Sequence, residues 1–93
     1  MSEPEATWHV YLVRCDDGSL YTGITTNLAR RVAEHNSGGA KGARYTRARR
    51  PVKLVYQECR ASRSEASKRE FLIRNLNKTD KEQLTLTCTS LVD

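Results

Sequence analysis

The sequence lacks a long apolar stretch and has few cysteines. No hydrophobic run approaches the roughly 18 residues that a membrane-spanning helix needs. The N-terminal segment MSEPEAT is acidic and lacks the apolar core of a signal peptide. The three cysteines, Cys15, Cys59 and Cys88, include no closely spaced pair, which argues against a zinc site and against a disulfide framework. These absences predict a cytoplasmic protein with reduced thiols and no membrane contact.

The length and composition are those of one small folded domain. The chain has 93 residues, of which 38% are hydrophobic and 29% are charged. At this size only about 60–65% of the surface of the unfolded chain is buried on folding, so we do not expect a deep enclosed pocket. We expect a domain at residues 8–85, between a flexible N-terminal tail at 1–7 and a polar C-terminal tail at 86–93.

Positive charge is concentrated in one stretch of the chain. The net charge is +5, and the sequence KGARYTRARRPVK at residues 41–53, here called the basic segment, contains no acid. Such a segment is typical of a surface that binds a polyanion, although a solvated loop is the alternative. Tyr45 adds a ring on which a base could stack. The predicted nucleic-acid-binding residues are Lys41, Arg44, Tyr45, Arg47, Arg49, Arg50 and Lys53.

The first third of the chain predicts a β-hairpin. WHVYLVRC at residues 8–15 and SLYTGIT at residues 19–25 have strand-like compositions and are separated by Asp16-Asp17-Gly18. A three-residue loop with glycine at its third position fits a type I turn followed by a left-handed residue.

The length of this turn sets the register of the hairpin. A three-residue loop pairs Val13 with Tyr21 and Tyr11 with Gly23, so the two tyrosines share one face of the sheet. Gly23, opposite Tyr11, leaves open space between them. A two-residue loop would instead place the tyrosines on opposite faces, so a site that uses both depends on this turn.

The rest of the chain predicts helices around a third strand. Asn27 is a good N-cap for LARRVAEHNSGG, which ends in a glycine stop. Residues 52–59 read as a strand, and Ser62 with Glu65 forms a capping box for a helix through about residue 76. Thr79 or Asp80 could cap a short final helix through about residue 85. The predicted fold class is α/β (α+β), with a small three-stranded, largely antiparallel sheet flanked by helices.

Several polar side chains fall where chemistry could use them. Arg31 and His35 are four residues apart and share a helix face. Glu70 lies on a helical stripe with Ala66 and Ile73, and a carboxylate on a partly apolar stripe must find a cation, a hydrogen-bond donor or a metal ion. Singly, each of these side chains has an ordinary structural explanation. Their combination and their order along the chain carry more weight.

This order resembles the GIY-YIG nuclease superfamily over about residues 8–85. Val10-Tyr11-Leu12 stands where the family has its first motif, and Tyr21-Thr22-Gly23 stands where it has its second. TTNLARRVAEH resembles the helix of the family that carries an arginine, and EASKREFLIRNL resembles the helix that supplies a metal-binding acid. The length of the chain is most similar to that of the small stand-alone bacterial members.

The resemblance implies roles for individual residues. Arg31 would bind the phosphate, and Glu70 would hold Mg²⁺ or Mn²⁺ through a single carboxylate, which suffices for an ion that keeps most of its waters. Tyr11 is the favoured general base, with Tyr21 assisting it or orienting water, and His35 could accept the phenolic proton. Which tyrosine takes the proton is left open by the resemblance. Gly23 has a structural role.

The motifs also depart from the family pattern. The tripeptides differ from the eponymous ones, and Ile24 stands where the excision-repair branch has lysine. The late asparagine of several branches has no counterpart, because Asn75 and Asn77 follow Glu70 too closely. We predict a metal-dependent endonuclease that hydrolyses phosphodiester bonds in nucleic acid, with DNA favoured over RNA. The alternatives are a non-catalytic nucleic-acid-binding module and a protein-interaction domain, and the sequence does not indicate an oligomeric state.

Overall fold

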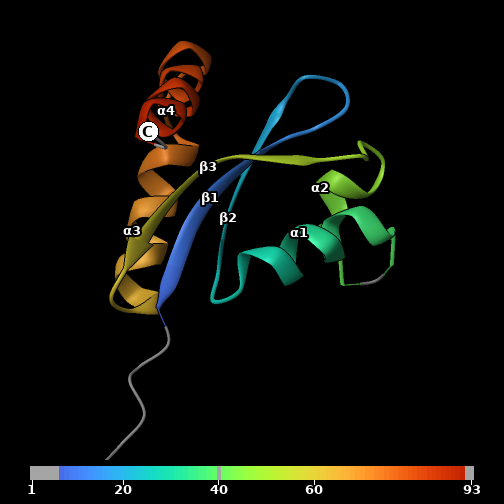
Figure 1. Cartoon of the computed structure of the whole chain (residues 1–93), viewed down its shortest axis with the longest axis horizontal. Coiled ribbons are helices and arrows are strands. Elements are labelled where there is room, and N and C mark those ends of the chain that lie inside the picture. Colours follow the sequence, from blue (N-terminus) through green and yellow to red (C-terminus); the bar gives the residue numbers. More distant parts are fainter. Residues whose placement is uncertain (1–6, 40, 92–93) are drawn as a thin grey trace, which may run out of the picture.

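A three-stranded antiparallel sheet lies between two pairs of helices (Figure 1). The computed structural model describes residues 7–39 and 41–91, with the backbone alone for 87–91. The elements are β1 (Trp8–Arg14), β2 (Leu20–Thr25), α1 (Leu28–Ser37), α2 (Arg44–Arg47), β3 (Lys53–Arg60), α3 (Arg63–Arg74) and α4 (Lys78–Leu91). The strand order is β2-β1-β3, so β1 is the central strand. This arrangement confirms the predicted fold class.

The hairpin has the predicted register. Gly18 adopts a left-handed conformation with φ +87°, and its N–H donates to the carbonyl of Cys15 at 2.9 Å. Tyr11 pairs with Gly23, and Val13 pairs with Tyr21. Glycine takes this φ without the steric cost that a side chain would add, so the third loop position determines which residues of β2 face each side of the sheet.

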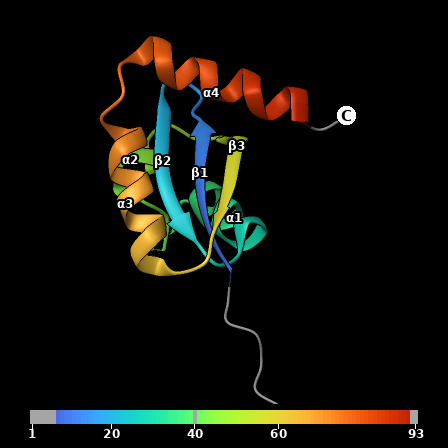
Figure 2. The same cartoon turned by 90° about the vertical axis from the view of Figure 1, so that its left-hand side faces the viewer.

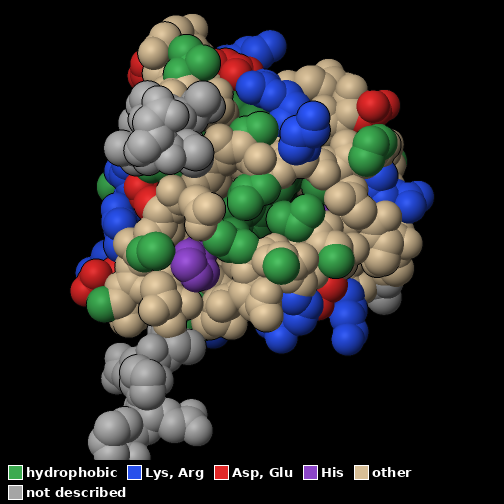
Figure 3. All heavy atoms as spheres, viewed as in Figure 1, with side chains coloured by type: hydrophobic (Ala, Val, Ile, Leu, Met, Phe, Trp, Pro, Cys, Tyr) green, Lys and Arg blue, Asp and Glu red, His purple; other side chains and the backbone are tan. Residues whose placement is uncertain are grey.

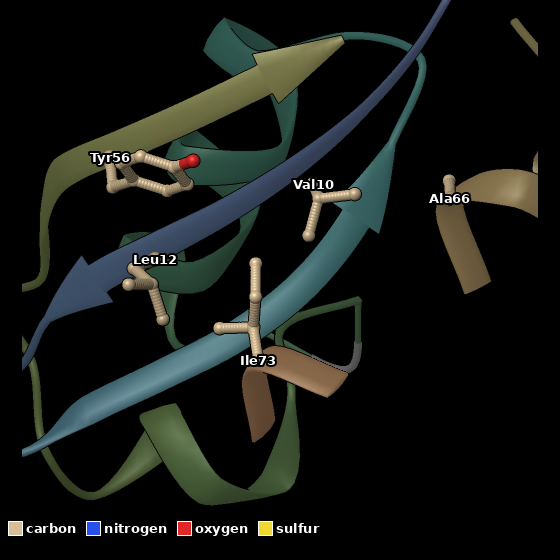
Figure 4. Close-up of a cluster of buried hydrophobic side chains, with 5 residues drawn as sticks. All are labelled: Val10, Leu12, Tyr56, Ala66 and Ile73. Atoms are coloured by element: carbon tan, nitrogen blue, oxygen red, sulfur yellow. The ribbon is translucent and has the colours of Figure 1, made fainter. Parts of the chain in front are cut away.

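One face of the sheet packs on α3. Val10 and Leu12 of β1 form a buried cluster with Ala66 and Ile73 of α3, joined by Tyr56 of β3 (Figure 4). The alternation of side chains along β1 requires Tyr11 and Val13 to point to the opposite face. Figure 1 shows α3 and α4 on one side of the sheet and α1 and α2 on the other.

The opposite face holds the second buried cluster. Tyr11 and Val13 pack there with Cys15 and Val52, and the half-buried side chains against this cluster include Leu28 and Val32 of α1. The apolar stripe of α1 thus holds that helix over the face that presents Tyr11.

Figure 3 gives a view of the surface in which hydrophobic side chains gather at the centre, with Lys and Arg side chains around them.

The ends of α1 and α3 follow from their capping residues. The side chain of Asn27 accepts a hydrogen bond from the N–H of Arg30 at 3.0 Å, and Gly38 ends α1 with φ +77°. At the start of α3, the Ser62 hydroxyl accepts from the N–H of Glu65 at 3.2 Å. Both predicted N-caps are confirmed, and α3 ends two residues earlier than expected.

The prediction for the last helix was wrong at both ends. The cap is Asn77, whose Oδ1 accepts from the N–H of Asp80 at 2.8 Å. The helix continues to Leu91 rather than ending near residue 85, because residues 86–91 contain no glycine or proline to stop it. The guanidinium of Arg14 on β1 holds α4 through both carboxylate oxygens of Glu82, at 2.5 and 2.6 Å. The predicted C-terminal tail is therefore helical through Leu91.

The basic segment is not a plain loop. Residues 44–47 form the one-turn helix α2, because the carbonyl of Ala43 accepts hydrogen bonds from the N–H groups of Thr46 and Arg47 at 3.1 and 3.0 Å. This turn brings Thr46 to the inside of the protein, where it is fully buried.

The predicted N-terminal tail lies outside the described residues, except for Thr7. In the part of the chain that is described, no helix combines the length and the apolar character needed to cross a membrane.

Gly23 does not leave a gap beside Tyr11, as the sequence had suggested. The phenol ring of Tyr11 fills that space, and a Cβ atom built on Gly23 would lie 2.6 Å from Cζ of the ring and closer still to its hydroxyl. Tyr11 is consequently only 1% exposed. The glycine lets the ring lie flat against the neighbouring strand.

Substitution Gly23→Ala should therefore destabilise the protein by about 1–3 kcal/mol, because the new methyl group must push the buried ring aside. Urea unfolding followed by circular dichroism measures this loss. Gly39→Ala is the control, since its nearest neighbour is Ser37 Oγ at an ordinary 3.5 Å. Equal stability of the two variants would contradict the close packing of Tyr11 on Gly23.

Candidate active site

The site is built around a hydrogen bond between β1 and α1. The hydroxyl of Tyr11 lies 2.8 Å from Nε2 of His35, and both side chains are buried, His35 completely. On the other side of the imidazole, Nδ1 lies 2.8 Å from the hydroxyl of Thr46 in α2. Three elements far apart in the sequence thus meet at one ring.

Burial keeps both partners of this bond neutral. Loss of hydration raises the pKa of Tyr11 to about 12, against the effect of Arg31, which lowers it, while Tyr21 and Glu70 add smaller increases. Burial and the positive charge of Arg31 together lower the pKa of His35 to about 4, against a smaller opposite effect of Glu34. Arg31 favours ionisation of Tyr11, but its effect on the pKa is smaller than that of desolvation, so the phenol is less acidic than a tyrosine in water.

Arg31 is anchored through one of its nitrogens. Its Nη1 donates to Glu34 at 2.9 Å and to the carbonyl of Lys41 at 2.6 Å. The guanidinium also lies within hydrogen-bonding reach of the Tyr11 hydroxyl and lowers the pKa of that phenol. Glu34 and the Lys41 carbonyl thus hold Arg31 beside Tyr11, and a guanidinium with five N–H donors has further donors to offer an oxyanion.

Glu70 approaches the site from the other face of the sheet. Its helix α3 lies beside β2, the edge strand (Figure 2). The carboxylate lies near enough to raise the pKa of Tyr11, although α3 and Tyr11 belong to different buried clusters. Its side chain is 21% exposed, and its closest cation is Arg74, at a long 4.0 Å. Glu70 therefore lies inward, as its stripe predicts, and it lacks a close ion pair.

Tyr21 belongs to a stack of side chains rather than standing free. Its ring meets His35 edge-on at 5.3 Å between centroids and is stacked on Tyr45 at 5.8 Å. The guanidinium of Arg49 covers the Tyr45 ring at 4.0 Å and pairs with Asp17 at 3.0 Å. Tyr45 therefore already has two stacking partners, so its predicted use as a platform for a base requires one of them to move.

The basic segment divides into structural and available cations. Arg50 donates to the carbonyl of Arg47 at 2.9 Å, and its guanidinium packs against Gly38 at the end of α1, which makes it a structural residue in the protein alone. Arg49 is likewise engaged. The side chains of Lys41, Arg44, Arg47 and Lys53 have no hydrogen bond or ion pair at contact distance within the described part of the chain, and these are the cations that remain for a polyanion.

The residues present fit a single hard cation and do not fit a preformed metal cage. Within residues 7–39 and 41–91, no three His, Cys, Asp or Glu side chains gather into a possible metal site. Glu70 offers carboxylate oxygens without a close ion pair. Magnesium and manganese suit such a site, since they prefer oxygen ligands and magnesium commonly uses one or two carboxylates with waters and substrate phosphate.

Comparison with known proteins identifies the family of the chain. Residues 7–83 match the GIY-YIG catalytic domain. The chain belongs to the GIY-YIG family. The match includes both tyrosines of the hairpin, Arg31 and His35 on α1, and Glu70 on α3.

Two relatives at high identity carry the name UPF0213 protein. The UPF0213 protein DP2720 of Desulfotalea psychrophila is 66% identical over 77 residues, which is 83% of this chain and 69% of that protein. The UPF0213 protein SH2523 of Staphylococcus haemolyticus is 54% identical over 82% of this chain and 90% of its own length. The solution NMR structure of EF2693 from E. faecalis is similar with a TM-score of 0.59 and 41% identity, covering 92% of this chain and 90% of that one.

Sequence reasoning missed Thr46 and Glu34. Thr46 was read only as part of a basic run, and Glu34 was not considered, although it orients Arg31 from one turn away. The spacing of Arg31 and Glu34 on one helix could have revealed the second contact. Nothing local to Thr46 indicates that α2 turns it toward His35.

The lowered pKa of His35 predicts that the free energy of unfolding depends on pH. The unfolded chain protonates this histidine near pH 6.5, whereas the folded protein does so only near pH 4, so stability is complete above pH 6.5 and falls as the pH is lowered toward 4. The loss should reach at most about 3 kcal/mol. Urea unfolding at a series of pH values measures it.

The variant His35→Gln should lack this slope between pH 6.5 and about 4.5, while His9→Gln, which removes the other histidine, should keep it. A slope that survives in His35→Gln, or an imidazole signal of His35 that titrates near pH 6.5, would show that the ring is not held neutral by burial.

Proposed function

We propose that this protein is a metal-dependent endonuclease that hydrolyses phosphodiester bonds in nucleic acid, with DNA favoured over RNA. The observation that carries the proposal is the meeting of Tyr11, Arg31 and His35 on one face of the sheet, with Glu70 on the helix of the other face near enough for its charge to act on the Tyr11 phenol. Membership of the GIY-YIG family supports the same chemistry, since the match to its catalytic domain spans residues 7–83 and so includes these side chains.

Arg31 is the proposed phosphate ligand. Its Nη1 contacts with Glu34 and the Lys41 carbonyl hold the group in place, so little side-chain entropy is lost when a phosphate binds. The guanidinium has five N–H donors, and those that Glu34, Lys41 and Tyr11 leave over can donate to the scissile phosphate. The same donors stabilise the negative charge that grows on the phosphate oxygens as water attacks.

Glu70 is the proposed ligand of Mg²⁺ or Mn²⁺. Among the side chains that the structure describes, the cation that pairs with this carboxylate is Arg74, at 4.0 Å, so binding a metal ion there would break only this weak ion pair. A divalent ion held by this carboxylate would neutralise phosphate charge and favour ionisation of nearby water. Arg31 and the metal ion held by Glu70 would together bind the scissile phosphate, from the two sides of the edge strand β2.

Tyr11 and His35 are the proposed path for the proton. Tyr11 must lose its own proton before its oxygen can accept one from water, and its hydroxyl already lies 2.8 Å from His35 Nε2. With a pKa raised to about 12, the phenol gives up this proton only when positive charge approaches it. His35 is neutral at neutral pH and can receive the proton. Tyr21, whose ring meets the imidazole edge-on, would orient the imidazole or the attacking water.

The available cations of the basic segment are proposed to position the nucleic acid. Arg44 and Arg47 lie on α2, which packs against α1, the helix that carries Arg31. Contacts from such side chains to the phosphate backbone give affinity and register without reading the sequence of bases.

The proposal is tested by cleavage of labelled single-stranded, duplex and branched DNA, and of RNA, with Mg²⁺, Mn²⁺ or a chelator. Wild-type protein should cut in the presence of metal only. Glu70→Gln and Arg31→Lys should each lower kcat by about 100-fold or more, because each removes a group that acts on the transition state.

The matched controls lie on the same helices and face solvent. Glu65→Gln on α3 and Arg30→Lys on α1 make the same chemical changes away from the site and should keep most of the activity. Full activity in Glu70→Gln or in Arg31→Lys would refute the assignment. Binding of nucleic acid without metal-dependent cutting by the wild type would point to a non-catalytic binding module.

The proposed role of α2 predicts a change in salt dependence. Arg44→Ala with Arg47→Ala should weaken binding to duplex DNA about tenfold near 0.1 M salt, and should lower the slope of log K against log salt by up to about 2, because two phosphate contacts are lost. Fluorescence anisotropy across a salt series measures both quantities.

A variant with the same charge change elsewhere provides the control. Lys78→Ala with Lys81→Ala removes two cations from α4, which lies on the other side of the sheet from α2 (Figure 1), and should leave the slope unchanged. If the two double variants behave alike, α2 is not the binding surface and its charges are merely solvated.

A further inference from the structure

Thr46 is buried in a segment whose other side chains are mostly charged and exposed. Its neighbours Tyr45 and Arg47 are exposed, whereas Thr46 has no exposed surface at all. Its hydroxyl oxygen contacts two groups, namely Nδ1 of His35 at 2.8 Å and the carbonyl of Ala43 at 3.0 Å. These two contacts have different chemical capacities, and the difference fixes where the protons are.

A threonine hydroxyl has one proton to donate. The carbonyl of Ala43, which also accepts from the N–H groups of Thr46 and Arg47, can only accept; when the Thr46 hydroxyl donates its proton to this carbonyl, the Thr46 oxygen accepts from His35. Nδ1 of His35 therefore carries a proton. In the neutral ring Nε2 then carries none, and it accepts the hydroxyl proton of Tyr11 across 2.8 Å.

We propose that Thr46 is a positioning residue that holds His35 in the tautomer with the proton on Nδ1, so that Nε2 is kept free to receive the proton of Tyr11. The use of this tautomer in cleavage rests on the proposed function, whereas the tautomer itself does not. In this arrangement Tyr11 donates to His35, His35 donates to Thr46, and Thr46 donates to the carbonyl of Ala43.

The arrangement suits His35 both before and after it takes the proton. When Nε2 gains the proton from Tyr11, the imidazolium has two N–H donors, and Thr46 still accepts from Nδ1 without any rotation. No bond to Thr46 has to break during the transfer. The titratable groups that act on the ring are Tyr11, Tyr21, Arg31 and Glu34, from β1, β2 and α1.

Removal of the Thr46 oxygen should reverse the tautomer. In Thr46→Val the side chain keeps its shape and loses its acceptor, so a proton on Nδ1 would be buried without a partner. The ring then gains by placing its proton on Nε2, where the Tyr11 oxygen can accept it. In that state His35 donates to Tyr11 and cannot take its proton, so the general base is blocked although every proposed catalytic side chain is present.

The test begins with the tautomer, which needs neither metal nor nucleic acid. The nitrogen chemical shifts of His35 in the full chain, measured by NMR at pH 7 with ¹⁵N labelling, distinguish a protonated ring nitrogen from a bare one. Wild type and Thr46→Ser should show a proton on Nδ1 and none on Nε2, and Thr46→Val should show the proton moved to Nε2. A wild-type spectrum with the proton on Nε2 overturns the proposal even if Thr46→Val fails to fold.

The second arm compares kcat and KM for cleavage. Thr46→Val should lower kcat by about 30- to 100-fold with KM changed less than about twofold, and Thr46→Ser should restore most of kcat. Thr22→Val is the control for loss of a buried threonine hydroxyl, because Thr22 pairs with Leu12 and faces the α3 side of the sheet. It should keep both the tautomer and kcat.

The outcomes separate this proposal from the proposed function. An unchanged tautomer in Thr46→Val, or an unchanged kcat despite a reversed tautomer, overturns the role of Thr46. Absence of metal-dependent cleavage by the wild type defeats the proposed function instead, and the spectra then still decide whether Thr46 sets the tautomer of His35.

Discussion

The hydrogen bond from Tyr11 to His35 is the interaction on which the site depends. It joins the central strand to α1 inside the protein, and it exists because Gly23 on the neighbouring strand has no side chain to displace the phenol ring. Burial makes the bond sensitive to charge, since each partner resists ionisation in a medium of low polarity. The protein alone is thus held in a neutral resting state that an approaching cation can disturb.

The rest of the proposed site combines residues from the two faces of the sheet. Alternation along β1 sends Tyr11 to the α1 face and Val10 and Leu12 to the α3 face, so an acid on α3 is separated from the phenol by the thickness of the sheet. Because α3 lies beside the edge strand β2, Glu70 is near enough for its charge to act on the phenol from the other face. The proposed site therefore lies at the edge of the sheet, between residues of both faces.

Local sequence signals predicted much of this arrangement. Asp16-Asp17-Gly18 fixed the loop length and with it the shared face of the two tyrosines, and Asn27 and Ser62 marked the helix starts because their side chains cap the next turn. Contacts between distant segments could not be predicted from local sequence patterns. The place of Thr46 depends on how α2 packs, and the pKa of His35 depends on burial by elements far along the chain, which no local pattern encodes.

The most direct test of the proposed site is a crystal structure of Tyr11→Phe, which should fold but not cut, with Mn²⁺ and a short DNA duplex. We predict an anomalous manganese signal at the Glu70 carboxylate and one phosphate bound between that ion and the Arg31 guanidinium. Manganese bound elsewhere, or DNA lying on a surface that leaves Arg31 without a phosphate, would contradict a site formed at the β2 edge from both faces of the sheet.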